Sequence, residues 1–256
     1  MKLYYLPGAC SLASHIALIW ADMDYELERL SYETVHGPAF MPLNPKGAVP
    51  TITLNTADGR PAVLTESLAV LLYIAALGPA ARLGAGASDL FEQAKINEII
   101  AELVSEVHKT FVPAFVPDRF VVDAGAQDGA RAAAFKMVEK AFRRVDGYLE
   151  GQEWLALGRR TVADAYLHVL SRWLRNTPTP MSAFPNVARH FEALAGDVGV
   201  KRALSEEDLP RTDDRHARKK IGDCSEHHDL ARPRQGDGEY RLRDVDDADR
   251  RWPARD

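Results

Sequence analysis

Cys10 is the residue whose type and position most favour chemistry in this sequence. It follows a short apolar segment, residues 2–6, and the chain-breaking pair Pro7-Gly8. A helical pattern opens directly after it at Ser11, and the first turn of a helix presents unpaired N–H groups and a partial positive charge. Both stabilise a thiolate, so we expect the pKa of the Cys10 thiol to fall. The alternative is a buried cysteine with a packing role only.

Cys10 has no partner thiol nearby in the sequence. Residue 13 is Ala13, so the C-x-x-C pair of a dithiol cycle is missing, although a single thiol that pairs with an external thiol remains possible. The second cysteine, Cys224, is accompanied by three histidines: His216, His227 and His228. Their spacing is irregular for metal ligands, and we expect no metal site.

Two other short motifs could hold a ligand through the backbone. Val49-Pro50 precedes a predicted strand, and a cis bond there would expose the Val49 N–H and C=O to an extended peptide. Glu66 and Ser67 open a predicted helix that Thr65 could cap. A hydroxyl and N–H groups at that point can hold a carboxylate, and Glu66 can pair with an amino group. A turn and a helix cap are the structural alternatives.

His108 and Lys109 are predicted to close a long helix. Cations are stabilised at the carboxyl end of a helix, which would give them a structural role. Alternatively they line a cleft that faces the first part of the chain, with Phe111 and Phe115 as an apolar wall. Core packing is the default role of such aromatic residues.

Composition excludes several classes of protein. The chain has 256 residues, is 46% apolar and carries a net charge of -5, so it can bury a sizeable core and lacks a dominant basic charge for nucleic acid. No segment approaches the roughly 20 apolar residues of a membrane helix, and the N-terminus lacks the long apolar region of a signal peptide. Two widely separated cysteines do not make a disulfide framework, so we expect a reducing, cytoplasmic location.

Residues 1–78 alternate between strand and helix patterns. The predicted strands are residues 2–6, 25–30, 51–54 and 62–64. The first two are separated by the helix that begins at Ser11 and should therefore be parallel. Asp58-Gly59 predicts an antiparallel hairpin between the last two, and a second helix follows Thr65. This order fits a thioredoxin-like domain.

The remainder of the chain divides into two regions of different sequence pattern. Residues 88–204, after a Gly/Ala-rich linker, contain no convincing strand and predict an all-helical domain. Its helical patterns cover residues 89–111, 129–149 and 162–175, with two shorter ones after Pro185 and Gly196. Thr161 and Asp164 have the spacing of a capping box, which serves folding. Residues 205–256 are highly charged with few large apolar residues, which predicts a disordered tail.

The fold class is therefore α+β: a thioredoxin-like N-terminal domain followed by an all-helical C-terminal domain. Five segments in order resemble one family: MKLYYLPGACSLASHIAL, NPKGAVPTI, LTESLAVLLYIA, EVHKTFVPAF and TVADAYLHVLSRW. Together they span about residues 1–204 and look like the beta-class, bacterial Cys-type glutathione transferases. The Cys inside PGACS is fairly specific to that class, whereas the other motifs are shared more widely.

The resemblance implies an enzyme that conjugates glutathione, its co-substrate, to a small hydrophobic electrophile. It also implies detoxification as the role and a homodimer as the assembly, with neither nucleic acid nor membrane as partner. Cys10 would lie beside the glutathione sulfur, and the Val49 backbone, before a cis Pro50, would pair with the cysteinyl part. Glu66 and Ser67 would hold the γ-glutamyl end.

The same resemblance places the helical domain over the thiol. His108 and Lys109 would reach toward the glutathione sulfur and the second substrate. Three aromatic residues would shape the apolar pocket: Phe111, Phe115 and Trp173. Family members often carry an Asn at the position of Ala101, so one glutathione contact is missing here or is supplied by Asn97 or Glu102.

The main partner of the thiolate stays open. Tyr5 and Ser11 are close in sequence to Cys10, and other classes of this fold use a Tyr or Ser hydroxyl for that contact. Cys10, supported by Ser11 and His108, is the preferred assignment.

Two functional alternatives also remain. One is glutathione-dependent thiol transfer or reductive dehalogenation through a Cys10 mixed disulfide. The other is a binding protein without catalysis, because fold does not fix function.

Overall fold

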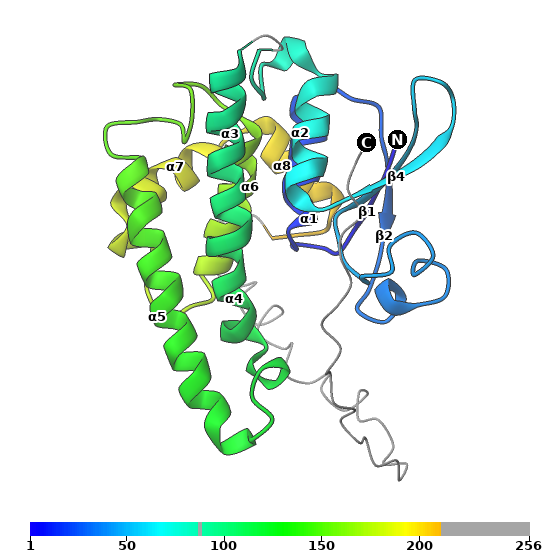
Figure 1. Ribbon diagram of the computed structural model, residues 1–256. Helices are drawn as coiled ribbons and strands as arrows, with labels where there is room; N and C mark the ends of the chain where they lie inside the picture. Colours follow the sequence, from blue (N-terminus) through cyan, green and yellow to red (C-terminus); the bar gives the residue numbers. More distant parts are fainter. Residues whose placement is uncertain (87–88, 211–256) are drawn as a thin grey trace, which may run out of the picture. The chain divides into compact units, whose positions relative to one another are not determined.

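The computed structural model describes residues 1–86 and 89–210 (Figure 1). The expectation for Cys224 and its neighbouring histidines, and most of the predicted tail, lie outside the described residues. Within the described part of the chain, no helix has the length and apolar character to cross a membrane. Nor does any group of three or more His, Cys, Asp or Glu side chains in these ranges form a candidate metal site.

The N-terminal domain is a four-stranded sheet with two helices. Its elements are β1 (Lys2–Tyr5), α1 (Ser11–Trp20), β2 (Glu26–Arg29), β3 (Thr51–Asn55), β4 (Pro61–Thr65) and α2 (Ser67–Leu77). The strand order is β2-β1-β3-β4, with β1 parallel to β2 and antiparallel to β3, and with β3 and β4 paired as a hairpin. The predicted thioredoxin-like arrangement is confirmed.

Side-chain alternation in the sheet creates an apolar face for the packing of helices. Leu3 of β1 lies opposite Leu27 in β2 and Ile52 in β3, and both Leu3 and Ile52 are fully buried. Alternate residues of a strand point to opposite faces, so this row forms one apolar surface. Nine of the ten residues of α1 are buried, and the helix contacts α2, α6 and α8. Thus α1 contacts helices of both domains.

The start of α2 differs from the predicted one. Thr65 is the last residue of β4, and Glu66 takes the N-cap position without a side-chain cap bond. The φ of Glu66 is 76°, in the left-handed region that a non-glycine residue rarely adopts. The hairpin turn before β4 does match the prediction, because Gly59 has a φ of 79° and donates to the Thr56 carbonyl at 2.8 Å.

The second domain is helical throughout its described residues. Its helices are α3 (Leu90–Glu102), a π-helical segment (Leu103–Val107), α4 (His108–Phe115), α5 (Ala124–Tyr148), α6 (Val162–Leu174), α7 (Pro185–Ala195) and α8 (Val198–Glu206). Short 3-10 turns lie at Thr34–His36, Pro79–Ala81, Pro117–Arg119 and Met181–Ala183. The structure confirms the predicted helical domain, with α5 beginning earlier than the pattern indicated.

Helix α6 is the buried axis of this domain. The predicted capping box is confirmed, since the Thr161 side chain accepts from the backbone at Asp164 and the Asp164 carboxylate accepts from Thr161 N at 2.7 Å. The same carboxylate accepts from Leu155 N at 3.0 Å and contacts His190 Nε2 at 3.0 Å. All but two of the thirteen residues of α6 are buried, so this cap is fixed deep in the fold.

The boundary of the tail at residue 205 is wrong. Helix α8 continues to Glu206, and the packed chain extends to Pro210, whose carbonyl accepts from Arg172 Nη2 at 3.3 Å. Composition counts Glu206 and Glu207 as solvated charges, but Glu207 is fully buried. Leu209 packs beside Gly8, so this segment belongs to the core.

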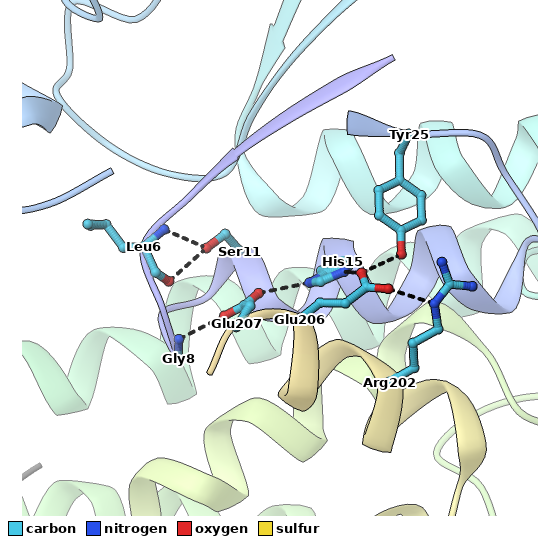
Figure 2. A network of polar contacts seen from close by, with 8 residues as sticks. All are labelled: Leu6, Gly8, Ser11, His15, Tyr25, Arg202, Glu206 and Glu207. Atoms are coloured by element: carbon cyan, nitrogen blue, oxygen red, sulfur yellow. Dashed lines mark hydrogen bonds and ion pairs between the residues drawn. The ribbon is translucent and has the colours of Figure 1, made fainter. Parts of the chain in front are cut away.

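Polar contacts hold the end of α8 against the N-terminal domain (Figure 2). His15 of α1 lies between two carboxylates, with Nδ1 3.1 Å from Glu207 and Nε2 2.8 Å from Glu206. Glu207 also accepts from Gly8 N at 2.9 Å, and Glu206 accepts from the Tyr25 hydroxyl at 2.8 Å. The last described residues therefore fix both α1 and the loop before Cys10.

A chain cut after Leu204 should be less stable than one cut after Pro210. The shorter chain leaves His15 and Gly8 N without their carboxylate partners, and a hydrogen bond to a charged group contributes about 1.5–3 kcal/mol. Urea unfolding of both chains, followed by circular dichroism, measures the difference. Equal unfolding midpoints would contradict the structural role of residues 205–210.

Candidate functional site

Cys10 lies where the amino ends of α1 and α2 meet the start of β3. It occupies the N-cap position of α1, and its Sγ donates to the Val49 carbonyl at 3.1 Å. The Val49-Pro50 peptide bond is cis, in agreement with the sequence-based hypothesis. Ser67, the first residue of α2, lies beside the Cys10 sulfur, and its hydroxyl acts to lower the pKa of the thiol.

The pKa of Cys10 moves in the direction opposite to the one predicted. Burial raises the pKa of the thiol from 9.0 to about 11, although hydrogen bonds from Ser67 and from the backbone of Cys10 and Ser11 act to lower it. Only 8% of the residue is exposed, so the charged form loses its hydration. At neutral pH Cys10 is therefore an uncharged thiol that donates a hydrogen bond.

Charged and polar groups at the start of α2 lie at the surface. Lys46 Nζ donates to Thr65 Oγ1 at 2.9 Å and is paired with the Glu66 carboxylate. Both Lys46 and Glu66 side chains are at least half exposed, whereas Ser67 beside them is 6% exposed. The left-handed backbone at Glu66 thus sets an accessible ion pair next to a buried hydroxyl.

A second group of polar side chains comes from the helical domain. His108 Nδ1 lies 2.7 Å from the Tyr166 hydroxyl, and the His108 ring packs edge-on against Trp173 with centroids 4.9 Å apart. Burial raises the pKa of Tyr166 well above its ordinary value, and the nearby Ser67 hydroxyl acts to lower that pKa. Cys10, Ser67, Tyr166 and His108 therefore form one cluster.

His108 does not close a helix as predicted. It is the first residue of α4, directly after the π-helical segment, inside a continuous helical run from Leu90 to Phe115. Single π-helical turns within α-helices are frequent at functional sites. Burial and the charge of the exposed neighbour Lys109 lower the pKa of His108 to about 4, so the ring is neutral at pH 7.

The peptide of Gly8 is held from both sides. Its N–H donates to Glu207 Oε2 at 2.9 Å, and its carbonyl accepts from Trp173 Nε1 at 2.8 Å. The φ of Gly8 is 71°, and a Cβ at this position would meet Leu209 at 3.4 Å. A side chain here would combine backbone strain with a tight contact.

Ser11 and Tyr5 make contacts away from the Cys10 sulfur. The Ser11 hydroxyl donates to the Leu6 carbonyl and accepts from Leu6 N, both at 3.3 Å, and so closes the loop before Cys10 (Figure 2). Tyr5 packs its ring near His15, with centroids 6.4 Å apart. Burial and the charge of Glu207 raise the pKa of Tyr5. Ser11 and Tyr5 therefore contact the residues that surround the site and not the Cys10 sulfur itself.

The aromatic residues predicted to form an apolar wall have different environments. Phe111 is 1% exposed and packs against Phe142 and Trp173, which makes it a core residue. Phe115 covers Phe111 with centroids 5.4 Å apart and is 36% exposed. Phe115 and the half-buried Trp173 are therefore the members that a second substrate could touch.

The position of Ala101 is exposed on α3, as is Asn97. Glu102 is engaged elsewhere, because Arg144 pairs with it and the Tyr148 hydroxyl donates to it at 3.0 Å. Within residues 1–86 and 89–210, Asn97 has no such partner, which distinguishes it from Glu102 as a substitute for the missing Asn.

Sequence reasoning missed three residues of this region. Tyr166 stands in the TVADAYLH segment, where no local pattern connects its hydroxyl with His108. Lys46 stands in the NPKGAVPTI segment, three residues before the Val49-Pro50 motif that was assigned to the site. Glu207 carried no local signal, since only the fold brings it to Gly8, 199 residues away.

The cluster is suited to bind an anionic sulfur. A thiol, a serine hydroxyl and the N–H groups that begin two helices all lie at one point, and such groups stabilise negative charge when water is excluded. The exposed Lys46–Glu66 pair next to them can bind a zwitterionic group.

Comparison with known proteins agrees with this geometry. Residues 8–77 match the family model of the glutathione S-transferase N-terminal domain, and residues 103–197 match that of the C-terminal domain. Glutathione S-transferase GST-4.5 of Xanthomonas campestris pv. campestris is 35% identical over 209 residues, which cover 82% of this chain and 100% of that relative.

Two solved structures extend the similarity. A sphingomonad glutathione S-transferase complexed with glutathione has 35% identity and a TM-score of 0.72, and covers 82% of this chain and 100% of its own. A beta-class glutathione S-transferase of Sphingomonas chungbukensis has 36% identity, the same TM-score and the same coverage. The chain therefore belongs to the glutathione S-transferase family, and its resemblance to the beta class is confirmed.

Proposed function

We propose that this protein binds glutathione at the amino ends of α1 and α2 and conjugates it, through its sulfur, to small apolar electrophiles. The observation that carries the proposal is the cluster of uncharged donors around the Cys10 sulfur, which is contributed by both domains. A relative 35% identical to this chain was solved with glutathione, which supports the same ligand here.

Each part of glutathione has a complementary group in this site. The Val49 backbone precedes β3 and can pair with the cysteinyl part as an added strand would. Glu66 and Lys46 offer both signs of charge to the γ-glutamyl amine and carboxylate, with Ser67 as a neutral donor. The glutathione sulfur then lies beside Cys10.

The protonation state of Cys10 decides its role. With a pKa of about 11, about one molecule in ten thousand carries a Cys10 thiolate at pH 7. The thiol can donate its proton in a hydrogen bond to the glutathione thiolate, which attacks the electrophilic carbon while the leaving group departs with its electron pair. Phe115 and Trp173 offer apolar surface to the electrophile.

The same property argues against the redox alternative. Thiol transfer or dehalogenation through a mixed disulfide requires Cys10 to act as a nucleophile, and the thiolate is the reactive form. A buried thiol with a raised pKa supplies little of it. A scaffold protein of this fold without catalysis would show no saturable glutathione binding.

A homodimer, a role in detoxification and a cytoplasmic location complete the proposal. Support for self-association comes from the resemblance to the beta class and from Leu90 and Phe91, which are 77% and 74% exposed at the amino end of α3. Large apolar side chains that are exposed side by side often mark an interface.

Cys10→Ala should stay folded and keep roughly a tenth or more of the wild-type rate of glutathione conjugation to a chloronitrobenzene. The variant loses one donor to the thiolate, and one hydrogen bond is worth about one factor of ten. Initial rates at fixed glutathione concentration measure the effect. A folded variant that binds glutathione but has no activity would support the mixed-disulfide route instead.

Alkylation of Cys10 by iodoacetamide should be slow at neutral pH and should accelerate up to about pH 11, because burial keeps the thiol protonated below that pH. Mass spectrometry of the peptide that contains Cys10 separates it from Cys224. Rapid labelling that is already maximal at pH 7 would show a thiolate and contradict the assigned role.

Ser67→Ala should raise the KM for glutathione about five- to tenfold, since one hydrogen bond to the ligand is lost at a nearly buried position. Steady-state kinetics with varied glutathione provide the measurement, and Ser182→Ala, at an exposed 3-10 turn, is the matched control. An unchanged KM in Ser67→Ala would remove Ser67 from the binding site.

A further inference from the structure

Tyr166 is a fully buried tyrosine at the contact between the two domains. It lies in the middle of α6, and its hydroxyl is 2.7 Å from His108 Nδ1 at the start of α4. We infer that Tyr166 fixes His108 in a single tautomer, with Nδ1 as hydrogen-bond acceptor and the proton on Nε2. In that form the ring can donate from Nε2 to the bound sulfur or the second substrate, a step that rests on the proposed function.

The direction of the hydrogen bond follows from the groups around the phenol. Burial raises the pKa of Tyr166 well above its ordinary value, so the phenol keeps its proton. Within the described residues, the hydrogen bond of the Tyr166 hydroxyl is to His108 Nδ1, at 2.7 Å. A fully buried O–H without an acceptor costs free energy, so the phenolic proton is directed to His108 Nδ1.

The charge state of His108 completes the assignment. Burial and Lys109 lower the pKa of His108 to about 4, so the ring is neutral at the pH of catalysis. A neutral imidazole has one donor and one acceptor nitrogen. Because Nδ1 accepts from Tyr166, the single proton must be on Nε2.

Packing holds the ring in place while the phenol selects its tautomer. Trp173 meets the His108 ring edge-on at 4.9 Å, and the same Trp173 donates to the Gly8 carbonyl at 2.8 Å. The orientation of His108 is thereby tied to the loop that carries Cys10. Tyr166 is a positioning residue in this scheme, since it acts on the reaction through His108.

Nitrogen-15 NMR of histidine-labelled protein reads the tautomer directly. The wild-type signals of His108, assigned by comparison with His108→Gln, should show a protonated Nε2 and an unprotonated Nδ1 across neutral pH. A wild-type spectrum with the proton on Nδ1 would overturn the inference, and this result requires no catalytic activity. The spectrum therefore separates a failure of the inference from a failure of the proposed function.

Tyr166→Phe gives the second test, because it keeps the ring and removes only the hydroxyl. We expect His108 to become a mixture of tautomers, kcat for conjugation to fall on the order of tenfold, and the KM for glutathione to change less than twofold. Tyr32→Phe, at an exposed loop position, is the matched control and should change neither the spectrum nor the rates. An unchanged His108 spectrum and kcat in Tyr166→Phe would reduce Tyr166 to a core residue and overturn the inference.

Discussion

The site depends on how the Gly8 peptide is held between the two domains. Its N–H is bound by the buried Glu207 carboxylate and its carbonyl by the Trp173 indole, so the loop between β1 and α1 cannot move without breaking contacts with α6 and the end of α8. Cys10 follows two residues later. A loop that belongs to the N-terminal domain by sequence is thus positioned by the C-terminal one.

Burial, rather than the helix start, sets the chemistry of the thiol. A charge near a helix terminus gains typically 0.3–1 kcal/mol, which is less than the 1.36 kcal/mol of one pKa unit. Removal of the sulfur from water outweighs that gain and the hydrogen bonds together, because the net pKa rises from 9.0 to about 11. The helix starts and donors remain available to stabilise the thiolate of a bound glutathione.

The elements of the fold that depend on local sequence patterns could be predicted. The candidate site could be predicted only in part. Strand alternation, the Asp58-Gly59 turn and the Thr161–Asp164 capping box are local signals, and all three appear in the structure. The raised pKa of Cys10 depends on tertiary burial, which no local pattern reports. Glu207 and Tyr166 reach the site only through packing of α8 and α6, so their roles could not be predicted from neighbours in the sequence.

The central claim is that glutathione, and not Cys10, carries the reactive thiolate. Ultraviolet difference absorbance of thiolate, recorded against pH for the protein alone and with saturating glutathione, tests it most directly. The account predicts no thiolate signal from the protein alone at neutral pH, and a signal with glutathione whose midpoint lies below the pKa of the free tripeptide. A strong neutral-pH signal from the protein alone, absent in Cys10→Ala, would contradict it.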